Sequence, residues 1–247
     1  KESGASDWKN AEIPGCVHLD LLNNELISEP FYGTNEKALQ WISDKDWNYK
    51  LTFEPEPGLL DQEKILLKFH GLDTYAEVLL NKKKILESDN MFHPWVADIR
   101  GILKEGDNEL LVHFSSPINR ILPTLQSSDH ILPADNDQIE NTSPYTRKAP
   151  YHYGWDWGPS FATSGIWQAV ELIGGGKWSV ESAHIVQDKV SSSKAELTLE
   201  MLVECSIDTE ADLLIVGERS STKISKRLQL KHGENQISEA IIIDHPD

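Results

Sequence analysis

Cysteine is nearly absent from this sequence of 247 residues, since Cys16 and Cys205 are the only two. Residues so far apart provide neither a closely spaced redox or zinc pair nor a disulfide framework. We therefore expect the fold to be stabilised by the packing of apolar side chains. Four of the histidines also lack metal-ligand spacing with one another, so we expect no metal site and no cofactor. These are His18, His93, His113 and His152.

Basic residues and long apolar runs are scarce as well. Lysine and arginine total 23 against 40 aspartates and glutamates, which gives a formal net charge of −17 at pH 7. Such a charge disfavours binding to phosphate backbones, so we expect no nucleic acid partner. No apolar run reaches the roughly 18 residues that cross a bilayer. The opening KESGASDW has neither a hydrophobic signal core nor an initiator methionine. We expect no membrane partner, and a chain that has been trimmed at its start.

The sequence does contain a series of short segments rich in branched and aromatic residues, separated by Pro, Gly, Asn or Asp. This pattern predicts the strands of a β-sandwich. The segments are WNYKLTF, KILLKFHGL, TYAEVLLN and NELLVHF. One helix is predicted before them, over His18–Ile27, with Pro30 after its end. Its Leu19, Leu22 and Leu26 form an apolar stripe that can dock on a core.

A long irregular stretch follows these predicted strands, from Ser115 to Arg147. It is too long for an idle connection in a compact domain, and long loops on β scaffolds usually carry function. The segment GIWQAVELI at positions 165–173 then predicts another strand. The three glycines at positions 174–176 are the best candidate for a domain boundary.

Beyond these glycines, apolar and polar residues alternate. In AELTLEMLVE, one face of an extended strand carries Ala195, Leu197, Leu199, Met201 and Val203. ADLLIVGE, ISKRLQLK and NQISEAIII predict further strands. Together they predict a second, immunoglobulin-like β-sandwich, from which a last strand could be missing. The whole chain is predicted to be all-β.

The segment YHYGWDWGPSFATSGIWQAVEL holds an unusual cluster, with Trp155, Asp156 and Trp157 between two glycines in a chain that has eight tryptophans. Burial of a charge between two large apolar side chains is costly unless the charge is paired. In an extended strand successive side chains face opposite ways. Both tryptophans would then share one face, and Asp156 would point away from them.

Four motifs follow one another in the chain: PGCVHLDLLNNELISEPFYGTNEKALQWISDKDWNY, GLDTYAEVLLN, ESDNMFHPW and RKAPYHYGWDWGPSFATSGIW. Together they resemble the N-terminal part of a β-mannosidase of glycoside hydrolase family 2. Any one of them would be weak evidence, whereas four in the same order indicate the family strongly. The resemblance runs from Pro14 to about Trp167, and loosely on to the end of the chain.

The resemblance implies a jelly-roll β-sandwich with a sugar-binding-like fold at 1–174, followed by an immunoglobulin-like β-sandwich at 175–247. In the family a (β/α)₈ catalytic barrel comes next, and it carries the two glutamates of the retaining mechanism. No catalytic residue is therefore expected in this chain. The family pattern also includes a β-strand upstream of position 1. The resemblance thus implies a piece of a longer protein, inactive by itself, whose partner is the barrel of the same protein.

The substrate implied by the resemblance is a β-mannoside, whose terminal mannosyl residue is released by exo-acting hydrolysis. Asp156 matches an aspartate that hydrogen-bonds sugar hydroxyls, and Trp155 would offer the sugar an aromatic face. A core position for Trp155 is equally open, and the preference for mannose over galactose or glucuronate rests on the motifs alone. Two other functions stay open, a stand-alone carbohydrate-binding module and a structural pair of sandwiches that assists assembly.

Ordinary structural roles are predicted for other residues of the motifs. Trp157 and Trp167 are expected in the core. Arg147 and Lys148 are expected to pair with acids in so acidic a chain. The acidic loop Asp135-Asn136-Asp137 favours an Asx turn over a calcium site. Turn chemistry is expected at Asp73 and Asn81, and packing alone at Asn90 and Met91.

Overall fold

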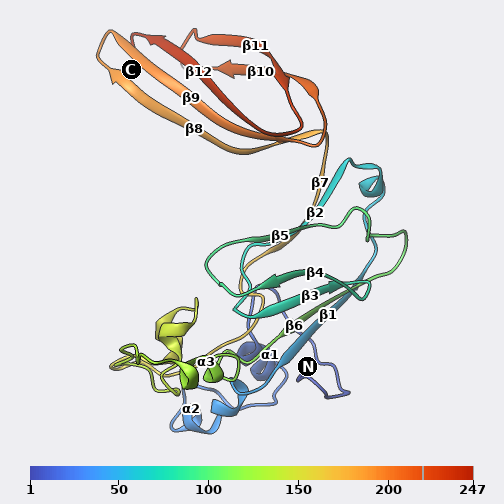
Figure 1. Ribbon diagram of the computed structural model, residues 1–247, viewed down its shortest axis with the longest axis vertical. Helices are drawn as coiled ribbons and strands as arrows, with labels where there is room; N and C mark the ends of the chain where they lie inside the picture. The colour runs from blue at the N-terminus through green and yellow to red at the C-terminus, as the bar shows by residue number, and fades with distance from the viewer. Residues whose placement is uncertain (219, 247) are drawn as a thin grey trace. The chain divides into compact units, whose positions relative to one another are not determined.

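The computed structural model describes residues 1–218 and 220–246, and β-strands dominate it (Figure 1). The strands are β1 Trp47–Phe53, β2 Lys64–Phe69, β3 Ala76–Leu80, β4 Lys83–Ser88, β5 Trp95–Asp98, β6 Asn108–Phe114, β7 Val170–Gly175, β8 Trp178–Val190, β9 Lys194–Cys205, β10 Thr209–Val216, β11 Lys223–Leu230 and β12 Gly233–Asp244. The helices are α1 Val17–Asn23, α2 Asn35–Ala38 and α3 Leu122–Ser127, with short 3₁₀ turns η1 Gln40–Ile42, η2 Leu59–Asp61, η3 Ser143–Tyr145 and η4 Pro150–Tyr153. The prediction of an all-β fold is confirmed. No helix within the described residues is long and apolar enough to span a bilayer.

The chain forms two compact units. The first comprises Lys1–Leu60 and Ile65–Ile173, and the second comprises Asp61–Lys64 and the residues from Gly174 onward. In the first unit, a sheet of order β1-β6-β3-β4 and a sheet of order β5-β2-β7 enclose the main apolar core. In the second unit the sheets are β12-β9-β8 and β10-β11. The domain limits 1–174 and 175–247 stay a prediction.

The core of the first unit follows directly from alternation along the strands. In β2, Ile65, Leu67 and Phe69 are at most 3% exposed, whereas the residues between them are half-buried. Strand β6 shows the same pattern, with Val112 and Phe114 buried. Full burial of each such side chain contributes about 1.5–3 kcal/mol, so these strands stabilise the scaffold that carries the functional loops.

The predicted strands are largely confirmed. WNYKLTF and NELLVHF coincide with β1 and β6, which pair antiparallel along their whole length. Along β9 the expected face is apolar, since Ala195, Leu199 and Val203 are buried. Strand β8 was not predicted, because most of its residues are exposed on either face and no alternation marks it. Main-chain pairing with β9 defines this strand, because its side-chain sequence does not.

The helix near the start differs from its prediction. It ends at Asn23 instead of Ile27, and Leu19 and Leu26 of the expected stripe are 53% and 50% exposed. Val17 and His18 are buried in their place, because the Val17 amide donates to the carbonyl of Ser164 and draws the first turn inward. The predicted docking stripe was therefore wrong.

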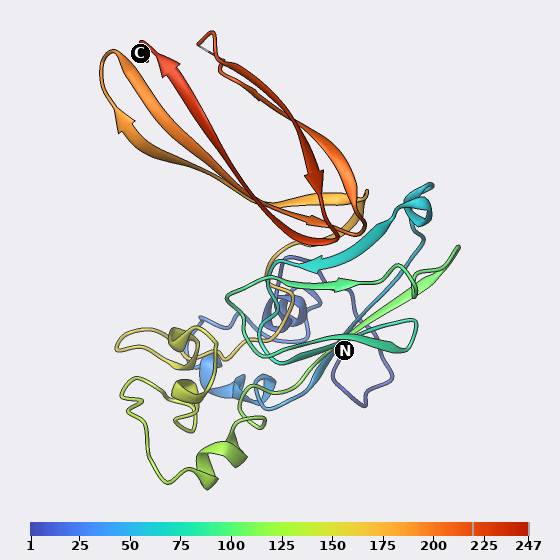
Figure 2. The ribbon, with the colours of Figure 1, turned by 45° about the horizontal axis from the view of Figure 1, so that its top comes forward.

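The segment between β6 and β7 contains no strand among its described residues, and it lies beside α2 in both ribbon views (Figures 1 and 2). Two hydrogen bonds fix this arrangement. The Ser160 amide donates to the Glu36 carboxylate at 2.7 Å, and the Gln40 amide side chain donates to the Ser160 carbonyl at 2.8 Å. The part of the segment around Ser160 is thus folded back onto the rest of the first unit, where it forms the site described next.

Candidate functional site

The Trp-Asp-Trp motif lies on a loop of residues 149–162, called the WDW loop below. The loop begins with η4 and then passes through Gly154, whose φ of 137° lies in a region that side chains disfavour. A Cβ atom at Gly154 would also overlap the main-chain oxygen of Asn136. Residues 156–158 then form a bend, so the extended conformation expected for the motif was wrong.

Both tryptophans of the motif lie outside the core. Trp157 is 84% exposed and Trp155 is 41% exposed. Their rings meet edge to face, with centroids 6.0 Å apart and planes at 89°. The two rings therefore do lie together, but the bend turns them away from the core and their mutual contact replaces core packing. The core position expected for Trp157 was wrong.

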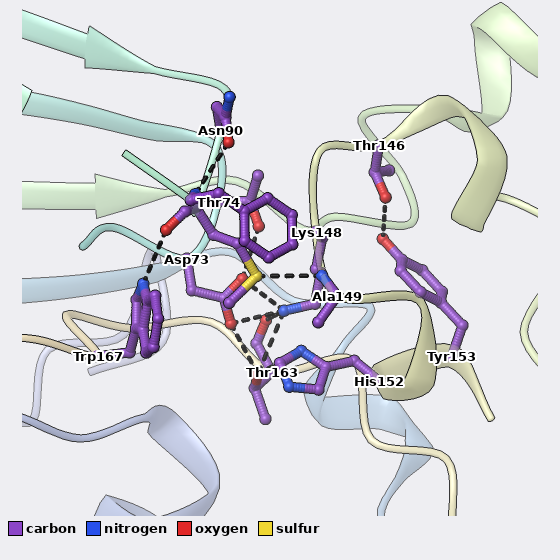
Figure 3. A network of polar contacts seen from close by, with 12 residues as sticks. Asp73, Thr74, Asn90, Thr146, Lys148, Ala149, His152, Tyr153, Thr163 and Trp167 are labelled. Atoms are coloured by element: carbon purple, nitrogen blue, oxygen red, sulfur yellow. Dashed lines mark hydrogen bonds and ion pairs between the residues drawn. The ribbon is translucent and has the colours of Figure 1, made fainter. Parts of the chain in front are cut away.

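Trp167 also departs from its predicted core position, since it is 36% exposed. Its indole N–H donates to the main-chain carbonyl of Met91 at 3.2 Å (Figure 3). The indole N–H of this half-exposed side chain thus links two segments of the chain by a hydrogen bond.

Asp156 is exposed at the tip of the loop. Within the described ranges its carboxylate makes no hydrogen bond and no ion pair to the protein. Asp137 provides a contrast, because its carboxylate accepts the main-chain N–H of Ile139 at 2.6 Å and of Ser143 at 2.8 Å. The Asx turn predicted there is confirmed. Asp156 does not cap a turn, so its acceptor oxygens are available to another molecule.

The base of the WDW loop is built on a buried ion pair (Figure 3). The Lys148 ammonium lies 2.5 Å from both carboxylate oxygens of Asp73, and the two side chains are 0% and 2% exposed. The same ammonium donates to the main-chain carbonyl of Thr163 at 2.8 Å. The Thr163 hydroxyl in turn donates to Asp73 at 2.7 Å. The two ends of the loop therefore meet at one carboxylate.

Asp73 also accepts hydrogen bonds from residues outside the WDW loop. The Thr74 hydroxyl donates to its carboxylate at 2.6 Å, and its main chain exchanges two hydrogen bonds with Gly165. The prediction of pairing with an acid is confirmed for Lys148 and wrong for Arg147, which forms no ion pair within the described residues. The prediction of simple turn chemistry at Asp73 was wrong, because its side chain is buried and pairs with a residue 75 positions away.

Burial sets the protonation of the groups around this pair. It lowers the pKa of the Lys148 amine, an effect that the Asp73 carboxylate opposes. Burial, and then the charge of Lys148, lowers the pKa of His152 to about 4 and that of His18 to about 4. Both imidazoles are therefore neutral at neutral pH, and the ammonium of the ion pair supplies the buried positive charge at the base of the loop.

Two residues expected only to pack have polar roles beside the loop. The Met91 sulfur accepts the main-chain N–H of Ala149 at 3.1 Å, and the Asn90 side chain accepts the N–H of Phe92 at 2.9 Å. The carbonyl of Arg147 accepts the Met91 N–H at 3.0 Å. The ESDNMFHPW motif thus supports the first residues of the WDW loop from the side.

Turn chemistry is confirmed at Asn81, which has a φ of 52° between β3 and β4. Its side chain bonds to Ile102, Asn108 and Glu109. Among the described residues no cluster of three or more His, Cys, Asp or Glu side chains could hold a metal ion.

β-Sandwiches carry many unrelated functions, so the fold and the exposed loop do not by themselves assign one. Residues 1–168 match the family model described as glycosyl hydrolase 2 galactose-binding domain-like, and the chain belongs to this family. The resemblance read from the four motifs is thereby confirmed.

Individual relatives carry more specific names. The chain is 35% identical over 239 residues to β-mannosidase B of Thermothelomyces thermophilus, a match that covers 96% of this chain and 27% of the relative. It is 40% identical over 162 residues to β-mannosidase B of Emericella nidulans, covering 65% and 19% of the two chains. The crystal structure of β-D-mannosidase from Dictyoglomus thermophilum superposes with a TM-score of 0.92 at 34% identity, covering 100% of this chain and 30% of that one. The chain thus spans less than a third of the length of these relatives.

Proposed function

We propose that this chain is the N-terminal, non-catalytic part of an exo-acting, retaining β-mannosidase. The relatives named β-mannosidase support this proposal, as does the fraction of their length that the chain spans. The glutamates that act as acid/base and nucleophile would lie in a barrel beyond this chain, and no glutamate here receives either role. The chain would supply one wall of the substrate pocket.

We assign the first unit to a jelly-roll, sugar-binding-like domain over 1–174, and the second to an immunoglobulin-like domain over 175–247. The pair of sheets in each compact unit supports this assignment. The three glycines at positions 174–176 give the backbone freedom at the junction.

Within the first unit, Asp156 is the proposed sugar-recognition residue. The observation that carries this role is its exposed carboxylate, which has no partner among the described residues although it sits on a loop with a buried, hydrogen-bonded base. A carboxylate accepts hydrogen bonds from two neighbouring hydroxyls of a sugar, and its charge strengthens both. Trp155, at the same tip, would pack its ring against the C–H face of the mannosyl residue.

The test is Asp156→Ala in the complete enzyme. Loss of a charge-assisted hydrogen bond costs roughly 1.5–3 kcal/mol, so kcat/KM on an aryl β-mannoside should fall about 10- to 150-fold. The melting temperature should not change, since the side chain stabilises nothing in the fold. Asp44→Ala, at another exposed acid of the same unit, is the matched control and should keep full kcat/KM.

Asp156→Asn separates charge from shape, because it keeps one acceptor oxygen and the size of the side chain. It should fall between the wild type and Asp156→Ala. If Asp156→Ala kept full kcat/KM and lost stability instead, the acid would be a structural cap and the recognition role would be wrong.

A further inference from the structure

Residues on both sides of the WDW loop converge on a single side chain. Lys148 immediately precedes the loop and Thr163 immediately follows it, and the Lys148 ammonium binds both the carbonyl and the hydroxyl oxygen of Thr163, at 2.8 Å and 3.2 Å. Asp73 receives the ammonium and the Thr163 hydroxyl together. A loop whose ends are close is the arrangement of an Ω-loop, and here the closure is polar and buried.

At this closure of the loop, hydrogen-bond donors and acceptors are matched. The ammonium has three donors, and it faces the Asp73 carboxylate and the carbonyl of Thr163. The hydroxyls of Thr74 and Thr163 each donate one hydrogen to the carboxylate. The ammonium, the carboxylate, the Thr163 carbonyl and the two hydroxyls thus bond to one another, and the His152 Nδ1 lies 3.4 Å from the Thr163 hydroxyl. The positions of these groups therefore determine one another.

A buried ion pair is a poor way to gain stability. The cost of removing two charges from water offsets most of their attraction, and a well-packed apolar pair of similar volume is often as good. Directional bonds, in contrast, specify one geometry, whereas apolar contacts permit several. The pair at the base of the loop is therefore better suited to fixing position than to adding free energy of folding.

The tip of the loop has few other restraints. Among the described residues, the stretch from Trp155 to Pro159 is reached only by the Gln138 side chain, 3.4 Å from the Trp155 carbonyl. Ser160, near the second end of the loop, is held firmly, by its bonds to Tyr153, Glu36 and Gln40. Trp155, Asp156 and Trp157 are all exposed. The direction in which Asp156 points is thus set largely by how the ends of the loop are held.

We propose that Lys148, Asp73 and Thr163 are positioning residues, which fix the WDW loop at its base so that Asp156 meets the sugar in one orientation. This inference rests on the proposed recognition role of Asp156. Thr163 is the residue to test, because Lys148→Met would leave a buried carboxylate unpaired and disturb the fold itself.

The first experiment measures amide hydrogen exchange in residues 149–162 of the chain. Thr163→Val removes the hydroxyl at the end of the loop and should accelerate exchange there roughly 10-fold or more. Thr74→Val is the matched control, since it also removes one hydroxyl from Asp73 but lies far from the loop in the sequence, whereas Thr163 adjoins its end. It should leave loop exchange as in the wild type. Thr163→Ser keeps the hydroxyl and should do the same.

The second experiment measures kcat/KM on an aryl β-mannoside in the complete enzyme. Misplacement of a contact by about 1 Å can cost up to roughly 100-fold, so Thr163→Val should lower kcat/KM by about 10-fold. In an Asp156→Ala background the same substitution should cause no further loss, because the residue that it positions is gone.

The outcomes separate the two ideas. If the amide exchange rate of the loop is unchanged in Thr163→Val, or is raised equally in Thr74→Val, Thr163 does not hold the loop at its base. An equal loss of kcat/KM in both backgrounds shows that Thr163 acts independently of Asp156 and overturns the positioning role. If Asp156→Ala alone has no effect on kcat/KM, the proposed recognition role fails, and with it the positioning of a sugar contact, whereas loop exchange still decides whether the base holds the loop.

Discussion

Acid should destabilise the first unit through His18. This side chain is 6% exposed, its Nδ1 has no hydrogen-bond partner in the described part of the chain, and its ring packs edge to face on Phe161. Burial and then the charges of Lys148 and His152 lower its pKa from 6.5 to about 4, while Asp73 opposes the shift. The folded state therefore favours neutral His18.

The sign and size follow from proton linkage. Because the pKa of folded His18 lies below that of the unfolded chain, its contribution to the free energy of unfolding is complete above about pH 6.5 and is lost as the pH falls toward 4. With pKa values of 6.5 and about 4, the loss is about 2 kcal/mol at pH 5 and about 3 kcal/mol at pH 4.

The assay compares the wild type with His18→Leu, which cannot titrate and removes the unpartnered nitrogen. Urea unfolding followed by tryptophan fluorescence reports on the first unit, because every tryptophan except Trp178 precedes Gly174. The difference in free energy between the two proteins should be constant above about pH 6.5 and should shift by about 2 kcal/mol in favour of the variant by pH 5.

His130→Leu is the matched control, at an exposed histidine of the same unit, and should follow the wild-type curve. Parallel curves for the wild type and His18→Leu from pH 7 to pH 4 would refute the assignment of acid sensitivity to the buried imidazole.

Two further predictions concern packing. Gly71→Ala should lower the free energy of unfolding by roughly 1–3 kcal/mol, because the new Cβ would overlap the Trp167 indole; Gly101→Ala, which meets open space, should cost much less, and equal losses on denaturant unfolding would contradict the clash. Trp157→Ala should change stability by no more than about 0.5 kcal/mol at its 84% exposed site. Phe69→Ala, at a fully buried site, should cost about 3–5 kcal/mol in the same assay, and a comparable loss in Trp157→Ala would show that the indole packs.

The sheets were predictable wherever one face of a strand is buried. Strands β2, β6 and β9 each carry an alternation that burial imposes, and their sequences show it. Strand β8 carries no such pattern, since most of its side chains are exposed and main-chain pairing alone defines it. Strands of that kind have no signal in side-chain polarity.

The site was predictable only in part. The motif around Asp156 marked the loop, because glycines, proline and tryptophans are concentrated there. The tie between Asp73 and Lys148 could not be predicted, since 75 positions separate the two residues and neither lies in a pattern that implies the other. Trp157 was misjudged for a physical reason: large aromatics are usually buried, but here a neighbouring ring at 6.0 Å supplies the contact that the core does not.

The separation between the buried base and the exposed tip of the WDW loop has a consequence for engineering. Residues 155–157 contribute little to the packing of the scaffold, whereas Lys148 and Asp73 are buried in it and Thr163 is half-buried and bonded to both. Libraries randomised at Trp155 and Trp157 should therefore leave most members folded, provided that the three residues at the base are left unchanged, so the proposed sugar contact at the tip can be varied separately from stability. The residues at the tip of the loop can thus be exchanged while the base that holds the loop stays the same.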